Sequence, residues 1–351
     1  MTLRAKIKMI QHKNILAAVL TSLVLLGGAL PALADSPAAP AAATATTPAA
    51  ATTPAAAATP APVDTAKAAA DAEKAATDSA AAAVAFEHSY PPVQLQGWSY
   101  AGIFGKYDQN QLRRGFQVFK EVCSNCHSAH LFSFRNLSEE GGPSYSEAQV
   151  KALAATYTIA DPDATGGKRP GLPSDRWPAP FATEKDARDA NGGALPPDFS
   201  VLAKARGVKR DFPWWLTDYV TTYQEGGPDY IHALLNGFHD AVPTGFMGPD
   251  GKPFVLPDGK HFNDYFPTHS IGMPPPLSDG LVKYAPAADG SSVPATVDQY
   301  SRDVASFMMW LSEPGLDGRK EAGFRVLMFL FLFAVIMYLV KRRIWSNVEG
   351  H

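Results

Sequence analysis

The chain has 351 residues, of which 46% are hydrophobic and 19% are charged, and its formal net charge is −3. Between Phe86 and Gly318 there are 19 Lys and Arg residues against 27 Asp and Glu residues, so this part of the chain carries a net charge of −8. A body of that sign repels nucleic acid and attracts basic proteins, which excludes nucleic-acid binding as a function.

The first 34 residues have the pattern of a secretory signal. Basic residues between Arg4 and Lys13 are followed by an apolar stretch from Ile15 to Leu30 and by the small-x-small cleavage site Ala32-Leu33-Ala34. The alternative, a retained N-terminal anchor, is disfavoured because the apolar stretch is short. We therefore expect the following residues to be exported to a bacterial periplasm.

A tract from about Asp35 to Ala85 consists almost wholly of Ala, Pro and Thr. It lacks large apolar residues and cannot bury a core, so we interpret residues 35–90 as a flexible, partly polyproline tether. The alanine content of Thr65 to Ala85 favours a transient helix there.

Globular sequence begins near Pro91, and its first predicted helix runs from Gln111 to Cys123. Apolar residues recur at helical spacing on one stripe of this helix, namely Leu112, Phe116, Phe119 and Cys123. Gly115 lowers the stability of a helix by about 1 kcal/mol relative to Ala. Its presence therefore indicates close packing against another helix.

The predicted helix leads directly into Cys123-Ser124-Asn125-Cys126-His127, the C-x-x-C-H attachment pattern of a c-type haem. Cys123 and Cys126 can form thioethers with the two vinyl groups of one porphyrin, and His127 is then placed to bind the iron on the proximal side. A redox dithiol or half a zinc site is disfavoured, because the histidine follows at once and the chain has no third cysteine. The motif therefore predicts one covalently bound haem c rather than a chance pair of buried thiols.

The next part of the chain, residues 136–211, is rich in Gly and Pro and is expected to be mainly irregular. A short helix is predicted at Gln149–Tyr157, and an extended loop at Gly166–Pro180. Two helices are then predicted, at Pro213–Gln224 and at Pro228–Gly237, each with proline in its first turn.

The last soluble helix is predicted to begin at Thr296, which forms a capping-box pair with Gln299, and to stop at Pro314-Gly315. Met309 is expected on the solvent side of this helix. The expected buried stripe consists of Tyr300, Val304, Phe307, Met308 and Leu311.

Residues 322–340 are apolar apart from Arg325, and as a helix they would extend about 28 Å, enough to cross a bilayer. We interpret residues 319–343 as a C-terminal transmembrane anchor, residues 91–318 as a periplasmic haem domain and residues 344–351 as a cytoplasmic tail. The basic residues flanking the apolar stretch are balanced, so the predicted signal peptide decides this orientation.

An iron that only carries electrons needs a sixth ligand. Met273 is the preferred residue, because it lies in the loop Ile271-Gly272-Met273-Pro274-Pro275-Pro276, where prolines hold the backbone extended and a glycine allows close approach. His269 would be the nearest distal acid–base group if the protein were a haem enzyme such as a peroxidase. The other potential ligands are Met247, Met308, Met309, His130, His232, His239, His261 and His269.

From about Pro91 to its C-terminus the chain resembles the cytochrome c1 family, the haem subunits of ubiquinol–cytochrome c reductase. C-x-x-C-H is common to all c-type cytochromes, but the ordered set of motifs around it is specific. The resemblance rests on Trp98-Ser99-Tyr100-Ala101-Gly102, Gln111 to Ser128, Leu195 to Ser200, Ala205-Arg206, Asp229-Tyr230, Tyr265-Phe266-Pro267, Ile271-Gly272-Met273, Glu313-Pro314 and Trp345-Ser346.

The resemblance implies a mainly α fold: a class I cytochrome c-like haem domain enlarged by long loops, with one C-terminal transmembrane helix. It implies that Met273 is the distal ligand and that Arg206 pairs with a haem propionate, while Tyr230, Asn191 and Pro197 line the haem crevice. Three departures from the family pattern leave these ligands untouched. They are Phe199 in place of the usual Leu, the Ala/Pro tract, and the absence of an extra cysteine pair found in some bacterial members.

By the same resemblance, the protein would sit in a bacterial inner membrane with cytochrome b and Rieske iron–sulfur subunits, in a dimeric complex. It would take one electron from the Rieske protein and pass it to a cytochrome c. The alternatives are a c-type cytochrome subunit of another membrane dehydrogenase or oxidase, and a haem peroxidase-type enzyme. A purely structural anchor protein would not need the haem motif.

Overall fold

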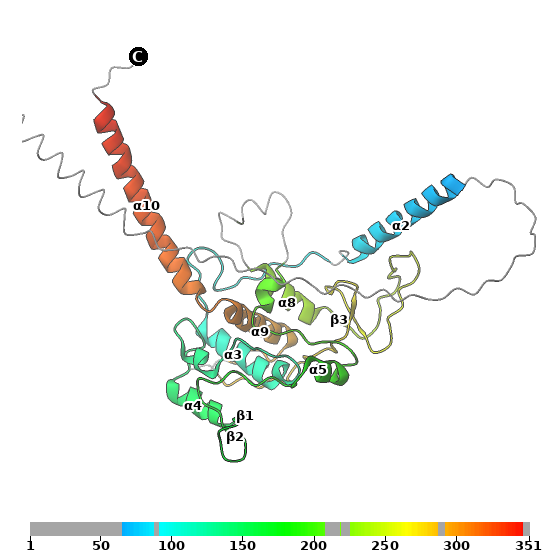
Figure 1. Cartoon of the computed structure of the whole chain (residues 1–351), viewed down its shortest axis with the longest axis horizontal. Helices are drawn as coiled ribbons and strands as arrows, with labels where there is room; N and C mark the ends of the chain where they lie inside the picture. Colours follow the sequence, from blue (N-terminus) through cyan, green and yellow to red (C-terminus); the bar gives the residue numbers. More distant parts are fainter. Residues whose placement is uncertain (1–64, 88–90, 208–217, 219–224, 287–291, 347–351) are drawn as a thin grey trace, which may run out of the picture. The chain divides into compact units, whose positions relative to one another are not determined.

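The computed structural model of the chain describes residues 65–87, 91–207, 218, 225–286 and 292–346. The predicted signal peptide, much of the predicted tether and, apart from Asp218, the helix predicted at Pro213–Gln224 lie outside these residues. The described part is mainly α-helical, as predicted, with two small antiparallel sheets (Figure 1).

Two helices form the centre of the core: α3 (Gln109–Glu121) and α9 (Val297–Ser312). α3 begins where the Asp108 carboxylate accepts hydrogen bonds from the backbone N–H groups of Asn110 and Gln111. The predicted capping box of α9 is half formed. The Thr296 hydroxyl accepts from the Gln299 backbone N–H at 3.3 Å, but the Gln299 side chain donates to Asp303 instead.

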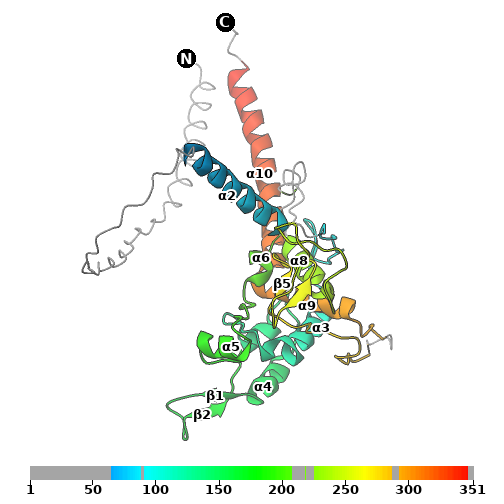
Figure 2. The ribbon, with the colours of Figure 1, turned by 90° about the vertical axis from the view of Figure 1, so that its right-hand side faces the viewer.

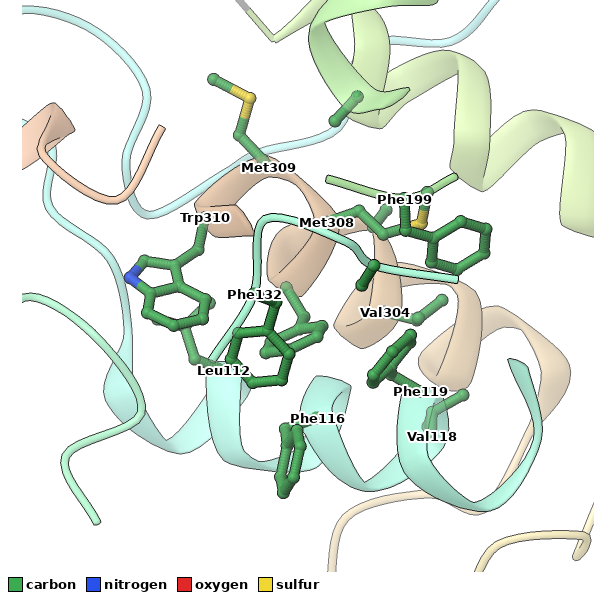
Figure 3. Packing of buried hydrophobic residues seen from close by; sticks show 14 of the residues in the cluster. Leu112, Phe116, Val118, Phe119, Phe132, Phe199, Val304, Met308, Met309 and Trp310 are labelled. Carbon is green, nitrogen blue, oxygen red and sulfur yellow. The ribbon is translucent and has the colours of Figure 1, made fainter. Parts of the chain in front are cut away.

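The predicted stripes of α3 and α9 meet in this core, with Phe132 and Phe199 from neighbouring loops beside them (Figure 3). A Cβ atom at Gly115 would lie 2.1 Å from the Asp303 carbonyl oxygen and 2.7 Å from Cβ of Phe307. The two backbones can approach this closely only because residue 115 is glycine. The predicted close packing at Gly115 is therefore confirmed.

The prediction that Met309 faces solvent is wrong, because its side chain is 0% exposed. Met309 points away from α3 (Figure 3), but α9 is also covered by α6 (Leu202–Ala205) and α8 (Gly226–Asn236). α8 corresponds to the helix predicted at Pro228–Gly237. A helix packed on several sides buries residues beyond one stripe.

The region expected to be mainly irregular contains more structure than predicted. The short helix α4 (Glu147–Ala155) is close to its expected position, but the hairpin β1–β2 (Thr158–Ala160 and Lys168–Pro170) and the helix α5 (Glu184–Ala190) were not predicted. The Arg169 guanidinium, on β2, forms ion pairs with Asp161 and Asp175 and so stabilises the hairpin. The remaining elements are α2 (Thr65–Glu87), η1 (Cys123–Asn125), η2 (Phe134–Ser138), and a three-stranded sheet of β3 (Phe238–His239), β4 (His261–Asn263) and β5 (Ser270–Ile271).

The C-terminal helix α10 (Leu316–Trp345) is 30 residues long and continuous (Figure 2). Among the described residues it is the one helix with the length and apolar composition to cross a membrane, and its most apolar stretch is not buried by the rest of the protein. Its first turns are joined to the residues before α3. The Lys320 ammonium group donates to the Tyr100 carbonyl, and the Tyr107 backbone N–H donates to the Asp317 carboxylate at 3.3 Å.

Candidate functional site

The cysteine motif begins immediately after α3. The helix ends at Glu121, and Cys123 starts the single turn η1. The backbone N–H groups of Cys126 and His127 both donate to the Cys123 carbonyl, at 3.1 and 2.9 Å. This tight turn gathers two free thiols and one imidazole at the end of a helix that is fixed in the core.

Hydrogen bonding determines which nitrogen of His127 is available. Its Nδ1 lies 2.8 Å from the Pro197 carbonyl oxygen. A carbonyl can only accept, so Nδ1 carries the proton and Nε2 presents its lone pair. Burial lowers the pKa of His127, against the smaller opposing effects of the Pro197 carbonyl and Asp198. The neutral imidazole required of an iron ligand is therefore the favoured form.

The segment that carries Pro197 is attached to the motif by further hydrogen bonds. The Asp198 carboxylate accepts from the Ser128 hydroxyl and the His130 backbone N–H at 2.8 Å each, and from the Ser200 backbone N–H. Phe199 donates its backbone N–H to the Ser128 carbonyl, and its ring lies 4.4 Å from the His127 ring, centroid to centroid. Asp198 and Phe199 thus hold His127 in place.

Sequence reasoning did not assign these roles to Asp198 and Phe199. Asp198 lies 70 residues after Ser128, and no local pattern indicates which backbone groups a carboxylate will meet at that separation. The available signal is that both residues belong to the segment Leu195 to Ser200, one of the motifs on which the family resemblance rests.

The two thiols lie in different surroundings. Cys126 is exposed, whereas Cys123 is partly buried against the core, and burial raises the pKa of its thiol to about 12. At neutral pH Cys123 is therefore a protonated thiol and not a thiolate nucleophile. Among the described residues no group of three or more His, Cys, Asp or Glu side chains is placed to hold a metal ion.

Met273 follows strand β5 by two residues and is partly exposed. A Cβ atom at Gly272 would lie 2.8 Å from Cβ of Ala194, so the glycine allows the Met273 loop to approach that residue. The segment from Ala194 to Pro197 therefore contacts the Met273 loop at one end and the His127 ring at the other. It connects the two residues predicted as axial ligands.

Several alternative ligands are occupied by other contacts. Nε2 of His232 lies 2.9 Å from Asp298, and Nε2 of His239 lies 2.7 Å from Asp264. Met308 and Met309 are buried in the core. The His269 side chain is 2% exposed, stacks on Phe262 and also meets Phe86 at the end of α2. An imidazole buried among aromatic rings does not suit the distal acid–base group of a haem enzyme.

The residues predicted to line the crevice differ in their placement. Pro197 contacts His127 directly. Asn191 is partly buried at the end of α5, where its amide donates to the Ala187 carbonyl at 2.7 Å. Tyr230 is buried in α8, and Arg206 is exposed at the end of α6.

Comparison with known proteins identifies the family. The sequence profile described as the Cytochrome C1 family matches residues 98–348. A "Cytochrome b/c1" of Bradyrhizobium diazoefficiens is 51% identical over 253 residues, which are 71% of this chain and 35% of that longer protein. The chain thus spans about a third of that relative.

Two relatives named "Cytochrome c1" are matched over most of their length. The protein of Blastochloris viridis is 46% identical over 260 residues, which cover 73% of this chain and 87% of the relative. The protein of Rhodospirillum rubrum is 44% identical over 264 residues, which cover 72% of this chain and 88% of the relative. The motif turn, the Pro197–His127 hydrogen bond and these similarities lead to one conclusion: the chain belongs to the cytochrome c1 family.

Proposed function

We propose that this protein is the electron-transferring haem c subunit of a bacterial quinol–cytochrome c oxidoreductase of the bc1 type. Membership of the cytochrome c1 family supports a haem c cofactor and a role in electron transport. The observation that carries the proposal is His127, which stands beside two free cysteines and directs Nε2 away from the Pro197 carbonyl.

The donor set fits one haem. Cys123 and Cys126 would bind it through two thioethers, His127 would be the proximal ligand and Met273 the distal ligand. When bound, the haem iron supplies a one-electron Fe(III)/Fe(II) couple, and a methionine ligand raises its potential. The hydrogen bond from His127 to Pro197 orients the imidazole, and the bonds from Ser128 and His130 to Asp198 keep the Pro197 segment in place.

Four further residues would surround this group. Pro197, Asn191 and Tyr230 would line the crevice, and Arg206 would pair with a propionate. The exposed Arg206 guanidinium forms no hydrogen bond or ion pair with the residues that the structure describes, so it is available for an anionic group. Arginine suits this role because it stays charged and binds carboxylates with two parallel hydrogen bonds.

The partners follow from the proposed complex. Cytochrome b and a Rieske iron–sulfur protein would be neighbouring subunits of a dimeric assembly. The Rieske protein would supply one electron, and a cytochrome c would accept it. Residues 91–318 would lie in the periplasm after removal of residues 1–34, and α10 would anchor them in the inner membrane with residues 344–351 in the cytoplasm.

Purification in mild detergent tests this function. We expect the full chain to copurify with a cytochrome b and a Rieske protein, and the preparation to reduce cytochrome c with quinol as the donor. The haem should remain on the polypeptide after acid–acetone extraction, with one haem per chain. A haem that extracts freely, or a chain that copurifies with an oxidase and no cytochrome b, would refute the proposal.

A further inference from the structure

Residues 101–105, Ala-Gly-Ile-Phe-Gly, form an apolar turn between Tyr100 and α3, here named the Ile103–Phe104 turn. Gly102 has a φ of +70°, and a Cβ atom at Gly105 would lie 2.1 Å from the Ala101 carbonyl oxygen. Both glycines are therefore required for this compact backbone. The turn displays its two large side chains to the outside, with Ile103 45% and Phe104 74% exposed.

The Ile103–Phe104 turn is joined to the start of α10 from both sides. The Lys320 ammonium group donates to the Tyr100 carbonyl before the turn and, at 3.5 Å, to the Gly105 carbonyl that ends it. After the turn, the Tyr107 backbone N–H donates to the Asp317 carboxylate at 3.3 Å. These bonds hold the turn against the first two turns of α10.

The apolar tip of the turn reaches the apolar part of α10. The Phe104 ring meets the Phe324 ring edge-on, with centroids 5.4 Å apart. Phe324 lies at the beginning of the apolar segment 322–340, and the residues that follow it on the same face, Leu327 and Phe331, are exposed. Phe104 therefore extends the exposed apolar surface of α10 sideways, at the end of the segment nearest the haem domain.

We propose that the Ile103–Phe104 turn inserts into the membrane as a second contact beside α10, with lipid as its partner. The inference rests on the proposed anchoring by α10. Lipid is favoured because the turn is uncharged, is continuous with the exposed apolar surface of α10, and is followed by Lys106, a residue type that suits the headgroup layer. Two exposed large apolar side chains in this position indicate contact with something other than water.

The second contact would orient the haem domain. A single helix leaves the attached domain able to rotate about the helix axis, whereas a second contact at the membrane surface restricts that rotation. The Ile103–Phe104 turn is followed by Asp108, which caps α3, and α3 ends at the Cys123 turn. A short rigid path therefore connects the membrane surface to the predicted haem attachment site.

Spin labelling of the full haem-loaded chain in vesicles of phosphatidylcholine and phosphatidylglycerol tests the proposal. Single cysteines would be introduced as Ile103→Cys and, separately, as Phe104→Cys, and labelled with a nitroxide. Oxygen concentrates in the hydrocarbon region, whereas a neutral nickel chelate stays in water. The ratio of their collision rates with the label therefore reports its depth. An unchanged haem absorption spectrum verifies that each variant is folded.

Two variants provide matched controls. Leu172→Cys replaces a leucine beside the β1–β2 hairpin that is 47% exposed, close to the value for Ile103, and it should report water. Phe329→Cys, on α10, should report lipid. The same labelling reaction on the wild-type protein measures the background labelling of Cys123 and Cys126.

We expect the oxygen-to-nickel collision ratio at residues 103 and 104 to exceed that at residue 172 several-fold and to lie below that at residue 329. A ratio equal to that at Leu172, with lipid reported at residue 329, would overturn the inference and leave the anchor intact. Exclusion of both reagents would also overturn it, because it would indicate burial by protein. A collision ratio at residue 329 as low as that of a label in water would refute the proposed anchor itself.

Discussion

His127 donates its Nδ1 proton to the Pro197 carbonyl, a residue 70 positions later in the chain, and its ring packs on Phe199. The hydrogen bond selects one tautomer, and the ring contact limits rotation of the imidazole. In the proposed cytochrome these two contacts would set the direction of Nε2 before any haem is bound. An axial ligand fixed in this way need not reorganise when the iron changes its charge.

Replacement of the proposed distal ligand is the most direct test at the residue scale. In Met273→Leu the apolar bulk remains but the thioether is lost. We expect the reduction potential to fall by a sizeable part of the ~0.8 V range that axial ligands span, and the iron to begin binding carbon monoxide. Redox titration and carbon monoxide difference spectra measure these changes.

Met247→Leu is the matched control, since Met247 is an exposed methionine beside Pro253 in another loop. It should leave both measurements unchanged. An unaltered potential in Met273→Leu would exclude Met273 and return the histidines to consideration. His261 would come first, because no carboxylate of a described residue contacts its ring, whereas His232 and His239 each have such a contact.

A second residue-scale prediction concerns Asp198. Burial alone would raise its pKa, but the hydrogen bonds from Ser200, His130 and Ser128 outweigh burial and lower the pKa below its ordinary value of 3.8. The ionised carboxylate therefore stabilises the fold fully above pH 3.8, and this contribution is lost as the pH falls through the lowered value.

Asp198→Asn should reduce the free energy of unfolding by about 2 kcal/mol near neutral pH, because charged hydrogen bonds are lost. The difference in the free energy of unfolding between the variant and the wild type should shrink as the pH falls into the acid range. Thermal unfolding of both proteins at several pH values measures it. The exposed Asp163→Asn is the control, and a pH-independent difference would contradict the prediction.

At the scale of the elements, the contact between α3 and α9 supports the site. The Asp303 carboxylate lies on α9 with its side chain 0% exposed, and it accepts two hydrogen bonds from Arg114 on α3 and one from Gln299. The charge is paired and its oxygens are hydrogen-bonded, so it is tolerated in the interior. Beside it, Gly115 sets how closely the two helices approach.

Gly115→Ala should therefore destabilise the protein, although alanine is the better helix former. The added methyl would meet backbone atoms of α9 and force the helices apart, at a cost of about 1–3 kcal/mol. The midpoint of thermal unfolding of the detergent-solubilised holoprotein reports this loss.

Gly318→Ala provides the comparison within the same protein. A Cβ atom at this α10 position has no neighbour within 4 Å, and helix propensity alone should make the substitution neutral or stabilising by up to about 1 kcal/mol. Equal effects of the two substitutions would show that the α3–α9 contact does not restrict residue 115.

At the scale of the whole molecule, net charge should control the encounter with the electron acceptor. The part of the chain between Phe86 and Gly318 carries −8, to which haem propionates would add. Electron transfer to a basic cytochrome c should therefore slow as salt rises, because the Debye length shortens to about 8 Å at physiological ionic strength. Stopped-flow kinetics over a range of salt concentrations tests this.

An acidic cytochrome c of similar potential is the control, and its reduction should accelerate with salt. A rate with the basic partner that stays flat or rises between low and moderate salt would argue against an electrostatic encounter. A permanently bound acceptor would give that result.

The sequence by itself determined the features that depend on neighbours along the chain. The C-x-x-C-H spacing, the stripes and approximate ends of α3 and α9, and the apolar length of α10 are all local patterns, and hydrogen bonding within one helix or turn is enough to produce them. Even the tight contact at Gly115 could be expected, because an interior helix glycine is costly unless packing requires it.

Only the tertiary structure decided the features that depend on residues distant along the chain. Met309 is buried because α6 and α8 cover a second side of α9, and the spacing within α9 carries no information about those helices. The pairing of His127 with Pro197, and of Asp198 with Ser128, joins segments about 70 residues apart. A carbonyl or carboxylate accepts from whichever donor the fold brings within 3 Å, and many positions in the sequence could supply that donor equally well.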